Sequence, residues 1–403
     1  MHGCHRPSSS PHIAIVGAGF GGATVARYVK TYHPDIRITL IEQSPVLHTC
    51  PFSNYVLAGF KRMDDITWTW DGLKNIGCDT IRGKVIALDA HRKTLTIEHH
   101  GTLRWDRLVL SPGIDMQWDA IDGYGPETAN LMPHAWKAGE QTLLLKKQID
   151  SMEDGGTMII TAPEMPYRCP PAPYERASVL AWYLKRHKPR SKIIILDGKK
   201  SFTKKALFEE GWKALYPAMI EWVPADQGGH VVAVSPQDRA VITADGRLWH
   251  GDVINVIPPQ TAGTLALEAG LAPHDEWCQI HPVTFESQEA KNIHIIGDST
   301  VAGAMPKSAF AANSQGKAVA LALSALLDDN TPSYPLLMNT CYSLLAPDYG
   351  ISVAASYRPS ATSIVAIHGG SGTSPLQASQ AFRKKEADYA HAWYQQMLSE
   401  IYG

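Results

Sequence analysis

Residues 12–42 read HIAIVGAGFGGATVARYVKTYHPDIRITLIE, and this stretch decides the class of fold. A β-prone apolar run leads into a glycine-rich loop, a helical pattern follows, and a second apolar run ends at Glu42, as in a dinucleotide-binding unit. In such a unit Gly17 permits the tight turn, Gly19 lets the backbone approach a pyrophosphate, and Gly22 lets helix and strand pack closely. Glu42 is then expected to bind ribose hydroxyls. The alternative is a glycine turn in another kind of α/β protein.

Two later segments favour FAD over NAD as the dinucleotide. Residues 108–113, LVLSPG, read as a strand that ends in a turn of small residues. Residues 292–298, NIHIIGD, read as a strand that ends at Gly297 and Asp298 and precedes a long helical pattern. Flavoprotein reductases with two dinucleotide-binding domains carry similar segments, in which the aspartate binds the ribityl or pyrophosphate region of the flavin. An aspartate in this place is also often only a helix cap, but together with the N-terminal loop it favours FAD.

A second strand–helix–strand unit lacks the loop that a pyrophosphate requires. Residues 157–161 and 192–196 are predicted strands, residues 175–187 a predicted helix, and Asp197 stands where the ribose-binding acid would be. The loop before the helix holds no glycine and five prolines, at positions 163, 166, 170, 171 and 173. Because proline has no N–H donor and a fixed φ, we expect that NAD(P)H does not bind here and is not the electron donor.

The six cysteines, at positions 4, 50, 78, 169, 278 and 341, form no C-x-x-C motif. This spacing argues against a zinc ribbon, a thioredoxin-type motif and a c-type haem attachment site in the chain, so no metal site is expected. Cys169 lies in the proline loop just before the helix, with Glu175 in the predicted first turn. We expect a solvent-accessible thiol of lowered pKa there. The alternative is a buried, inert cysteine.

The composition is that of an ordinary globular protein. The 403 residues are 44% hydrophobic and 19% charged, which suggests two or three domains with sizeable cores. With 37 basic and 39 acidic residues the net charge is −2, so binding of nucleic acid through bulk charge is not expected. The apolar runs are too short for a transmembrane helix, and the polar residues 1–11 contain no visible signal peptide.

Several long motifs resemble the flavoprotein subunit of flavocytochrome c sulfide dehydrogenase, a relative of the sulfide:quinone oxidoreductases. The resemblance runs from about residue 12 to the end of the chain, with the domains in the same order. The motifs that carry it are HTCPFSN at 48–54, PHAWKAGEQ at 133–141, YRCPPAPYERAS at 167–178, MPKSAFAANSQGK at 305–317, NTCYSLLAP at 339–347 and the segment 348–359.

The resemblance implies roles for individual residues. Cys50 matches the cysteine that forms a thioether to the flavin, although Pro51 follows it where the family has a larger aromatic residue. Cys169 and Cys341 match the pair that forms a redox-active disulfide over the flavin. Glu175 matches a carboxylate beside that disulfide, a base for the incoming substrate, and the match of Trp393 implies an aromatic ring near the isoalloxazine.

The start of the long helical run after Pro306 carries Lys307 and Ser308. A helix N-terminus aimed at the flavin would stabilise its anionic reduced form, and the alternative is an ordinary capped helix packed on the sheet.

These groups suggest a chemistry for sulfide. Hydrosulfide attack on the Cys169–Cys341 bridge would leave a persulfide on one cysteine and release the other as a thiolate that passes two electrons to the flavin. Glu175 would take a proton from hydrogen sulfide, so we expect Glu175→Gln to slow flavin reduction most at low pH. The alternative for the two cysteines is a structural crosslink, which would contribute roughly 5 kcal/mol in the chain-entropy model.

A flavin can release two electrons singly to a haem, and this chain has no haem motif. The resemblance therefore implies a heterodimer with a c-type cytochrome subunit and a periplasmic location. The nearest alternative function is that of a sulfide:quinone oxidoreductase, and a less favoured one is a non-catalytic flavin-binding interaction protein. The final helix mixes both signs of charge and lacks a wide apolar face, which argues against membrane docking.

The predicted fold is α/β, with two Rossmann-like domains and a C-terminal α+β region. We expect an FAD-binding domain at 12–115 and 255–330 and a second Rossmann-like domain without a functional NAD(P) loop at 116–254. The C-terminal region, 331–403, would lie near the flavin and the partner. It is predicted to hold strands at 338–346, 350–358 and 363–367, a glycine-serine linker at 368–374 and a helix at about 378–402.

Overall fold

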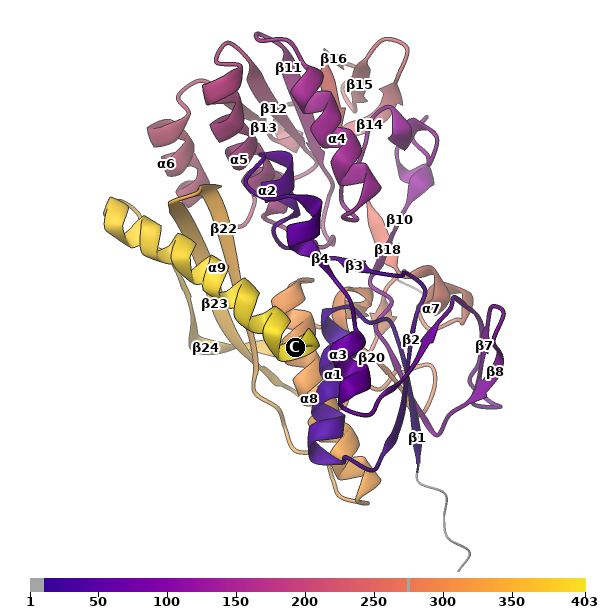
Figure 1. Ribbon diagram of the computed structural model, residues 1–403. Helices are drawn as coiled ribbons and strands as arrows, with labels where there is room; N and C mark the ends of the chain where they lie inside the picture. The colour runs from indigo at the N-terminus through magenta and orange to yellow at the C-terminus, as the bar shows by residue number, and fades with distance from the viewer. Residues whose placement is uncertain (1–10, 274–275) are drawn as a thin grey trace, which may run out of the picture.

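The computed structural model describes residues 11–273 and 276–403, which form two parallel sheets and a C-terminal region (Figure 1). The first sheet has the strand order β20-β9-β1-β2-β5. Its strands are β1 (His12–Val16), β2 (Arg37–Glu42), β5 (Asp79–Arg82), β9 (Arg107–Leu110) and β20 (Ile293–Ile295). Because β1 pairs in parallel with both β2 and β9, the loop after it lies at the centre of the sheet edge. Helix α1 (Phe20–Tyr32) follows that loop and lies against α8 (Ala309–Leu327).

Smaller elements surround this sheet. They are β3 (Leu47–His48), β4 (Thr67–Trp68), α3 (Asp71–Asn75), β6 (Val85–Asp89), β7 (Thr94–Ile97), β8 (Gly101–Arg104), α7 (Thr264–Glu268), β19 (Cys278–Gln279) and β21 (Thr300–Val301).

The second parallel sheet has the order β13-β12-β11-β17. Its strands are β11 (Thr157–Ala162), β12 (Lys192–Asp197), β13 (Ile220–Val223) and β17 (Val253–Asn255). Its helices are α4 (Glu140–Ser151), α5 (Ala172–His187) and α6 (Lys205–Leu215), and α2 (Ser53–Leu57) lies against α4 and α5. An antiparallel meander adds β14 (Val231–Ser235), β15 (Ala240–Thr243) and β16 (Leu248–His250).

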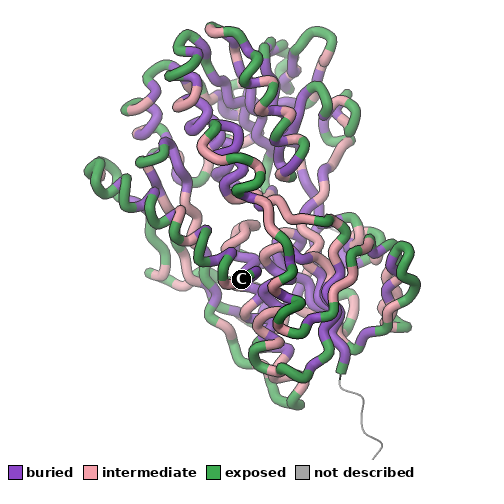
Figure 2. The backbone as a smooth tube through the Cα atoms, in the orientation of Figure 1, coloured by how far each residue is buried: buried purple, intermediate pink, exposed green. Residues whose placement is uncertain are grey.

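The two sheets are joined by an antiparallel pair, β10 (Ile114–Met116) and β18 (Gln260–Ala262), through which the chain leaves the first sheet and returns to it. With this connection the predicted α/β class with two Rossmann-like domains is confirmed. The apolar runs of β1, β2, β11 and β12 are buried (Figure 2). In the second sheet one face packs against helices such as α5, and the other packs against the meander β14–β16.

The C-terminal region is an antiparallel sheet and a long helix. Its strands are β22 (Leu337–Ala346), β23 (Tyr349–Pro359) and β24 (Ile364–Thr373), and its helix is α9 (Gln380–Tyr402). The prediction of a linker at 368–374 was wrong, since β24 continues to Thr373 and pairs it with Val353. Strand β24 lies at an exposed edge of its sheet and needs no apolar side chains. Its glycines and serines therefore lack the hydrophobic pattern on which the prediction of strands relied.

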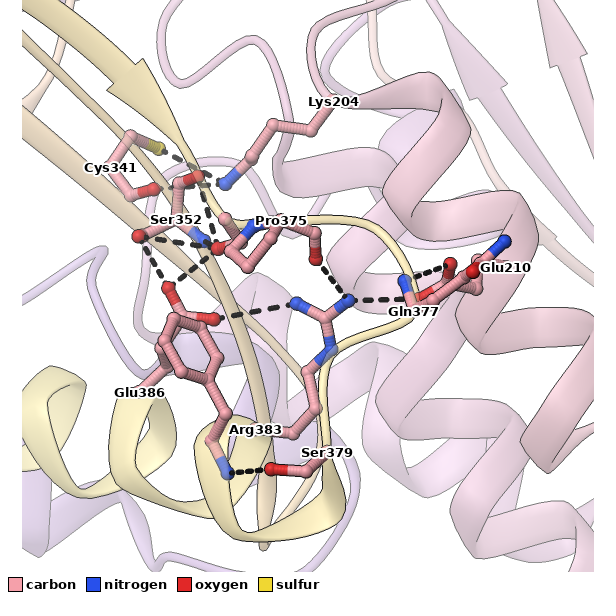
Figure 3. A network of polar contacts seen from close by, with 11 residues as sticks. Lys204, Glu210, Cys341, Ser352, Pro375, Gln377, Ser379, Arg383 and Glu386 are labelled. Atoms are coloured by element: carbon pink, nitrogen blue, oxygen red, sulfur yellow. Dashed lines mark hydrogen bonds and ion pairs between the residues drawn. The ribbon is translucent and has the colours of Figure 1, made fainter.

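Helix α9 is fixed to the rest of the molecule at both ends. Near its start Arg383, only 1% exposed, pairs with Glu210 of α6 at 2.8 Å and with Glu386 at 3.5 Å (Figure 3). At its end the Tyr402 hydroxyl donates to the Ala18 carbonyl in the glycine loop at 2.9 Å. Removing one partner of a buried ion pair is strongly destabilising, so these contacts hold α9 against both sheets. Among the described residues, no helix has the length and apolarity needed to cross a bilayer.

Candidate active site

A cavity of about 270 Å³ lies where the three parts of the molecule meet. Its lining comes from segments far apart in the sequence, and the predicted residues on its wall are Gly19, Cys50, Cys169, Glu175, Gly297, Asp298, Ser308, Cys341 and Trp393. A larger cavity of about 580 Å³ opens beyond β11, beside residues 163–166, and none of the predicted site residues lines it. The smaller cavity is therefore the candidate site.

The glycine loop forms one wall of this cavity. Gly17 has φ +96°, which glycine adopts without strain, and a Cβ on Gly22 would stand 2.0 Å from the carbonyl oxygen of Gly17. A Cβ on Gly19 would meet nothing within 4 Å, so that position opens toward the cavity. Glu42 lies behind the loop, where its carboxylate accepts hydrogen bonds from the amides of Ala18 and Ser44, each at 2.9 Å. These are the features that let a backbone approach a pyrophosphate.

Asp298 offers an unpaired acceptor to the cavity. Its Oδ1 is buried and has no hydrogen-bond partner, and burial raises the pKa of the carboxyl group. Arg168, which the sequence reading missed, is 4.0 Å from the other carboxyl oxygen and also donates to the Trp136 carbonyl. A buried acceptor without a partner is costly unless a ligand supplies a donor, and the polyol hydroxyls of FAD are donors of that kind. The residues present thus fit FAD.

The N-terminus of α8 faces the same cavity, through Ser308, Ala309 and Phe310. Ser308 caps the helix by accepting from the Ala311 amide at 3.1 Å, and it donates to Asn339 at 2.6 Å. Lys307 lies apart from the cavity lining. Its ammonium donates to the carbonyls of Asp298 and Thr300 at 2.9 and 2.7 Å. In this structure the helix end and the serine, and not the lysine side chain, face the candidate ligand site.

Cys169 and Cys341 come together inside the cavity. The two side chains lie within hydrogen-bond distance of each other. Cys169 lies in the loop before α5 with φ +55°, and its amide donates to the Lys307 carbonyl at 2.8 Å. Cys341 lies on β22. The backbone of each cysteine is thus fixed by a different part of the fold.

The expectation of a lowered pKa for Cys169 was wrong, because the two thiols share one negative charge. The hydrogen bond with Cys341 and burial raise the pKa of Cys169, whereas the pKa of Cys341 is lowered to about 6. The cause lies in the hydrogen bond from Cys169 and in a cation, Lys204, whose Nζ is 4.0 Å from the Cys341 sulfur. The helix N-terminus near Cys169 does not outweigh these groups.

Lys204 is a second residue that the sequence reading missed. It caps the N-terminus of α6 in a left-handed conformation, and its side chain is buried and extends to β22 (Figure 3). Its ammonium donates to the Cys341 carbonyl at 2.9 Å and to the Ser343 hydroxyl at 2.7 Å. No spacing rule would have found it, because it comes from a loop after Asp197 with no motif of its own.

Glu175 is in the first turn of α5, as predicted, and faces the thiol pair. Burial raises the pKa of its carboxyl group to about 8, which the nearby Lys204 ammonium partly offsets. A backbone hydrogen bond from Leu344 orients the carboxylate. Glu175 therefore gains and loses its proton near neutral pH, which a general base needs.

Cys50 and Trp393 stand on other walls of the cavity. The Cys50 sulfur donates to the Trp136 carbonyl at 3.7 Å. Trp393, on α9, stacks on Phe310 with ring centroids 5.9 Å apart and an interplanar angle of 11°. The indole N–H groups of Trp136 and Trp393 are buried without acceptors, so both are available to a ligand. Cys78 and Cys278 are buried elsewhere, and Cys4 lies outside the described residues.

Asp197, the acid that ends the second strand–helix–strand unit, is fully buried. Its carboxylate accepts from the Tyr174 hydroxyl at 2.5 Å and the Trp222 indole at 2.9 Å, and it pairs with Lys199 at 2.6 Å. Its exposure is 0%, so it cannot reach a ribose. These contacts give the acid of this unit a structural role, and the absence of nicotinamide binding stays a prediction.

The two sheets and the cavity define a class of protein, the flavoproteins with two dinucleotide-binding domains. Residues 11–145 match the pyridine nucleotide-disulphide oxidoreductase family. Residues 142–258 match the central part of the sulfide dehydrogenase (flavocytochrome c) flavoprotein chain, and residues 333–402 match the flavin-binding part of flavocytochrome c sulphide dehydrogenase. The chain belongs to the family of flavocytochrome c sulfide dehydrogenase flavoprotein chains.

Individual relatives agree with this assignment. The flavoprotein chain of sulfide dehydrogenase (flavocytochrome c) from Chlorobaculum thiosulfatiphilum is 48% identical over 44 residues, which are 11% of this chain and 92% of that relative's sequence. The sulfide-quinone reductase of Aquifex aeolicus is 22% identical over 183 residues, and this match spans 45% of this chain and 41% of the reductase.

Solved structures show the same fold. The sulfide:quinone oxidoreductase of Aquifex aeolicus superimposes with a TM-score of 0.78 at 18% identity, covering 97% of this chain and 91% of that one. An NAD-dependent persulfide reductase from A. fulgidus superimposes with a TM-score of 0.61 at 14% identity, covering 94% of this chain and 77% of that one.

Proposed function

We propose that this protein is a flavin-dependent sulfide dehydrogenase that oxidises hydrogen sulfide at the Cys169–Cys341 pair and passes electrons through FAD to a c-type cytochrome subunit in the periplasm. The observation that carries the proposal is the contact between the two sulfurs. They come from a loop before α5 and from β22, and they meet in one cavity with Glu175 and the glycine loop.

The oxidised pair supplies an electrophile for sulfide. Glu175, as a carboxylate, takes a proton from hydrogen sulfide and so produces hydrosulfide within the cavity. Hydrosulfide attacks one sulfur of the bridge, a new S–S bond forms, and the electron pair of the old bond passes to the other cysteine. The products are a persulfide on one cysteine and a thiolate on the other, so sulfide is oxidised and the bridge is reduced.

The residues around the cavity would hold FAD. The glycine loop would receive the pyrophosphate, Glu42 the adenosine ribose, and Asp298 the ribityl hydroxyls. Cys50 would form the covalent tether, and the N-terminus of α8 would stabilise negative charge on the ring. When bound, FAD supplies the ability to accept two electrons together and to release them one at a time.

A sulfide:quinone oxidoreductase function is the second candidate, because a sulfide-quinone reductase is among the relatives with a similar sequence. Helix α9 bears on this alternative. Its buried positions include Ala387, Ala390 and Leu398, and they face the protein. Most apolar side chains of α9 are therefore packed within the molecule, although Phe382 and Tyr389 are exposed. Two exposed rings do not form the wide apolar face of a membrane-docking helix, which favours a cytochrome over a membrane quinone as acceptor.

The test is an anaerobic titration of the purified holoenzyme with sulfide, followed through the flavin absorbance. We expect the flavin to be bleached by sulfide and the colour to return on addition of an oxidised c-type cytochrome. Faster return with a soluble quinone than with the cytochrome would favour the second function, and no bleaching by sulfide would reject both.

The covalent tether has a separate test. Acid-precipitated protein is expected to keep its yellow flavin, and Cys50→Ser protein to release it into the supernatant. A colourless wild-type pellet would rule the tether out without bearing on sulfide oxidation.

A further inference from the structure

We propose that Lys204 directs the opening of the Cys169–Cys341 bridge by holding the negative charge on Cys341, so that the incoming sulfur stays on Cys169. This inference rests on the proposed function, and it assigns Lys204 as a positioning residue. In the described part of the chain, its ammonium stands 4.0 Å from the Cys341 sulfur (Figure 3). The Cys341 carbonyl and the Ser343 hydroxyl accept hydrogen bonds from this ammonium and anchor it.

The loop that carries Lys204 is fixed at both ends. At its start Asp197 is buried and holds Lys199. In its middle the Phe202 ring stacks on Tyr174 of α5, with centroids 3.6 Å apart and an angle of 13°. Lys204 itself has φ +66° at the N-cap of α6 and is 9% exposed. The lysine therefore cannot leave the thiol without breaking buried contacts.

The charges around Cys341 favour one direction of bridge opening. The titratable groups that act on its thiol come from four elements: Cys169 before α5, Glu175 of α5, Lys204 at α6 and Tyr357 of β23. Lys204 is the one cation among these four. The hydrogen bond with Cys341, burial and the charges of Cys341 and Glu175 raise the pKa of Cys169, and they outweigh the opposing Lys204 ammonium. Arg176 also acts on Cys169, but the direction of the pKa shift shows that negative charge is disfavoured there. A thiolate leaving group is better where a cation holds it.

Charge and electrons are conserved when the bridge opens toward Cys341. Hydrosulfide attacks the Cys169 sulfur, and a new S–S bond forms there. The Cys169–Cys341 bond breaks, and both of its electrons pass to Cys341, which becomes the thiolate beside Lys204. The proton of hydrosulfide remains on the outer sulfur of the Cys169 persulfide, and one negative charge is present before and after the step.

A merely structural role for Lys204 is the competing explanation, since its two hydrogen bonds also join α6 to β22. Lys204→Gln keeps a hydrogen-bonding side chain and removes the charge, whereas Lys204→Arg keeps the charge. Lys205→Gln is the matched control, because the neighbouring lysine loses the same charge from a side chain that pairs with Glu209 at the surface. The three variants separate charge from hydrogen bonding.

The experiment measures thiol reactivity in the holoenzyme after reduction with dithiothreitol. Each variant is treated with iodoacetamide over a range of pH, and the alkylation of each cysteine is read by peptide mass spectrometry. In the wild type we expect Cys341 to react before Cys169, with a midpoint near pH 6. Lys204→Gln should raise this midpoint by about one to three pH units, whereas Lys204→Arg and Lys205→Gln should leave it nearly unchanged.

A second measurement on the wild type alone locates the sulfur. Oxidised holoenzyme is mixed anaerobically with less than one equivalent of sulfide and quenched with iodoacetamide, and the extra sulfur is expected on the Cys169 peptide. Extra sulfur on the Cys341 peptide would overturn the proposal even if Lys204→Gln failed to fold. So would an unchanged Cys341 midpoint in Lys204→Gln or an equal shift in Lys205→Gln. If sulfide neither bleaches the flavin nor leaves a persulfide, the proposed function fails, while the alkylation midpoints still decide the role of Lys204.

Discussion

The two strand–helix–strand units of this chain share an architecture but differ in their loops. In the first, residues 12–42, the loop after β1 is built from glycines that leave room in front of the helix. In the second, residues 157–197, the loop after β11 is rich in proline and carries a thiol. The acids differ as well. Glu42 is half-buried behind the glycine loop, whereas Asp197 is completely buried among Tyr174, Trp222 and Lys199.

The difference teaches how one supersecondary unit can serve two purposes. A backbone with free N–H groups at a helix N-terminus suits a pyrophosphate. A loop in which prolines remove many of those groups is poorly suited to a pyrophosphate, but it can hold a single side chain rigidly at the same helix end. Here Cys169 precedes that helix and Glu175 lies in its first turn, and both side chains line the candidate site.

The largest effect on the rate of flavin reduction is expected from removing the Cys341 thiol, which meets Cys169 of the second loop. Cys341→Ser leaves Cys169 without a bridge partner, so the rate of flavin reduction by sulfide should fall by about 10³-fold or more. Anaerobic stopped-flow absorbance measures this rate, and dithionite should still bleach the flavin of the variant. Cys78→Ala, a buried cysteine outside the cavity, is the control and should keep the wild-type rate. A wild-type rate of flavin reduction in Cys341→Ser would show that the Cys169–Cys341 pair has no redox role.

Glu175→Gln tests the carboxylate at the start of the second helix. Hydrosulfide needs no base and predominates at high pH, so the ratio of wild-type to variant rate should be largest, up to about 10²-fold, at low pH, where hydrogen sulfide is the substrate. The ratio should fall towards one as the pH rises above the Glu175 pKa of about 8. Glu164→Gln, an exposed carboxylate of the same loop, is the control, and a ratio near one at every pH would exclude Glu175 as the base.

Two glycine variants test the first loop. Gly22→Ala puts a methyl group 2.0 Å from the Gly17 carbonyl oxygen, so we expect a loss of about 1–3 kcal/mol in the free energy of unfolding of the apoprotein. Gly19→Ala meets nothing within the chain and should leave that stability unchanged while weakening FAD binding. Chemical denaturation and flavin titration of the apoproteins measure the two effects. Equal FAD affinity in Gly19→Ala and wild type would mean that the first loop does not receive the cofactor.

The smallest effect is expected from NADH. Five prolines remove N–H donors from the second loop, and the amides of Arg168 and Cys169 donate within the protein. Because Asp197 also has no free oxygen for a ribose, NADH should bleach the flavin at least about a hundredfold more slowly than sulfide. The same anaerobic absorbance assay gives both rates. Rapid bleaching by NADH would show that the two units still bind the same kind of ligand.

The sequence by itself determined the two units, the FAD-type glycine loop and the loss of the nicotinamide loop. These are local properties, because glycine and proline restrict the backbone wherever they stand and the apolar periodicity fixes which faces are buried. The resemblance to the family also identified Cys50, Cys169, Cys341, Glu175 and Trp393, and all five line the cavity. The hydrophobic pattern failed to predict the second half of β24, because this edge strand has little apolar character.

Only the tertiary structure decided which groups meet and which of them carry charge. The contact of Cys169 with Cys341 depends on the packing of α5 against β22, and the contact of Lys204 with Cys341 depends on a loop with no motif. The pKa values of both thiols and of Glu175 follow from burial and from neighbours distant in sequence. Desolvation and Coulomb interactions act through space and not along the chain, so no spacing rule could assign the thiolate to Cys341.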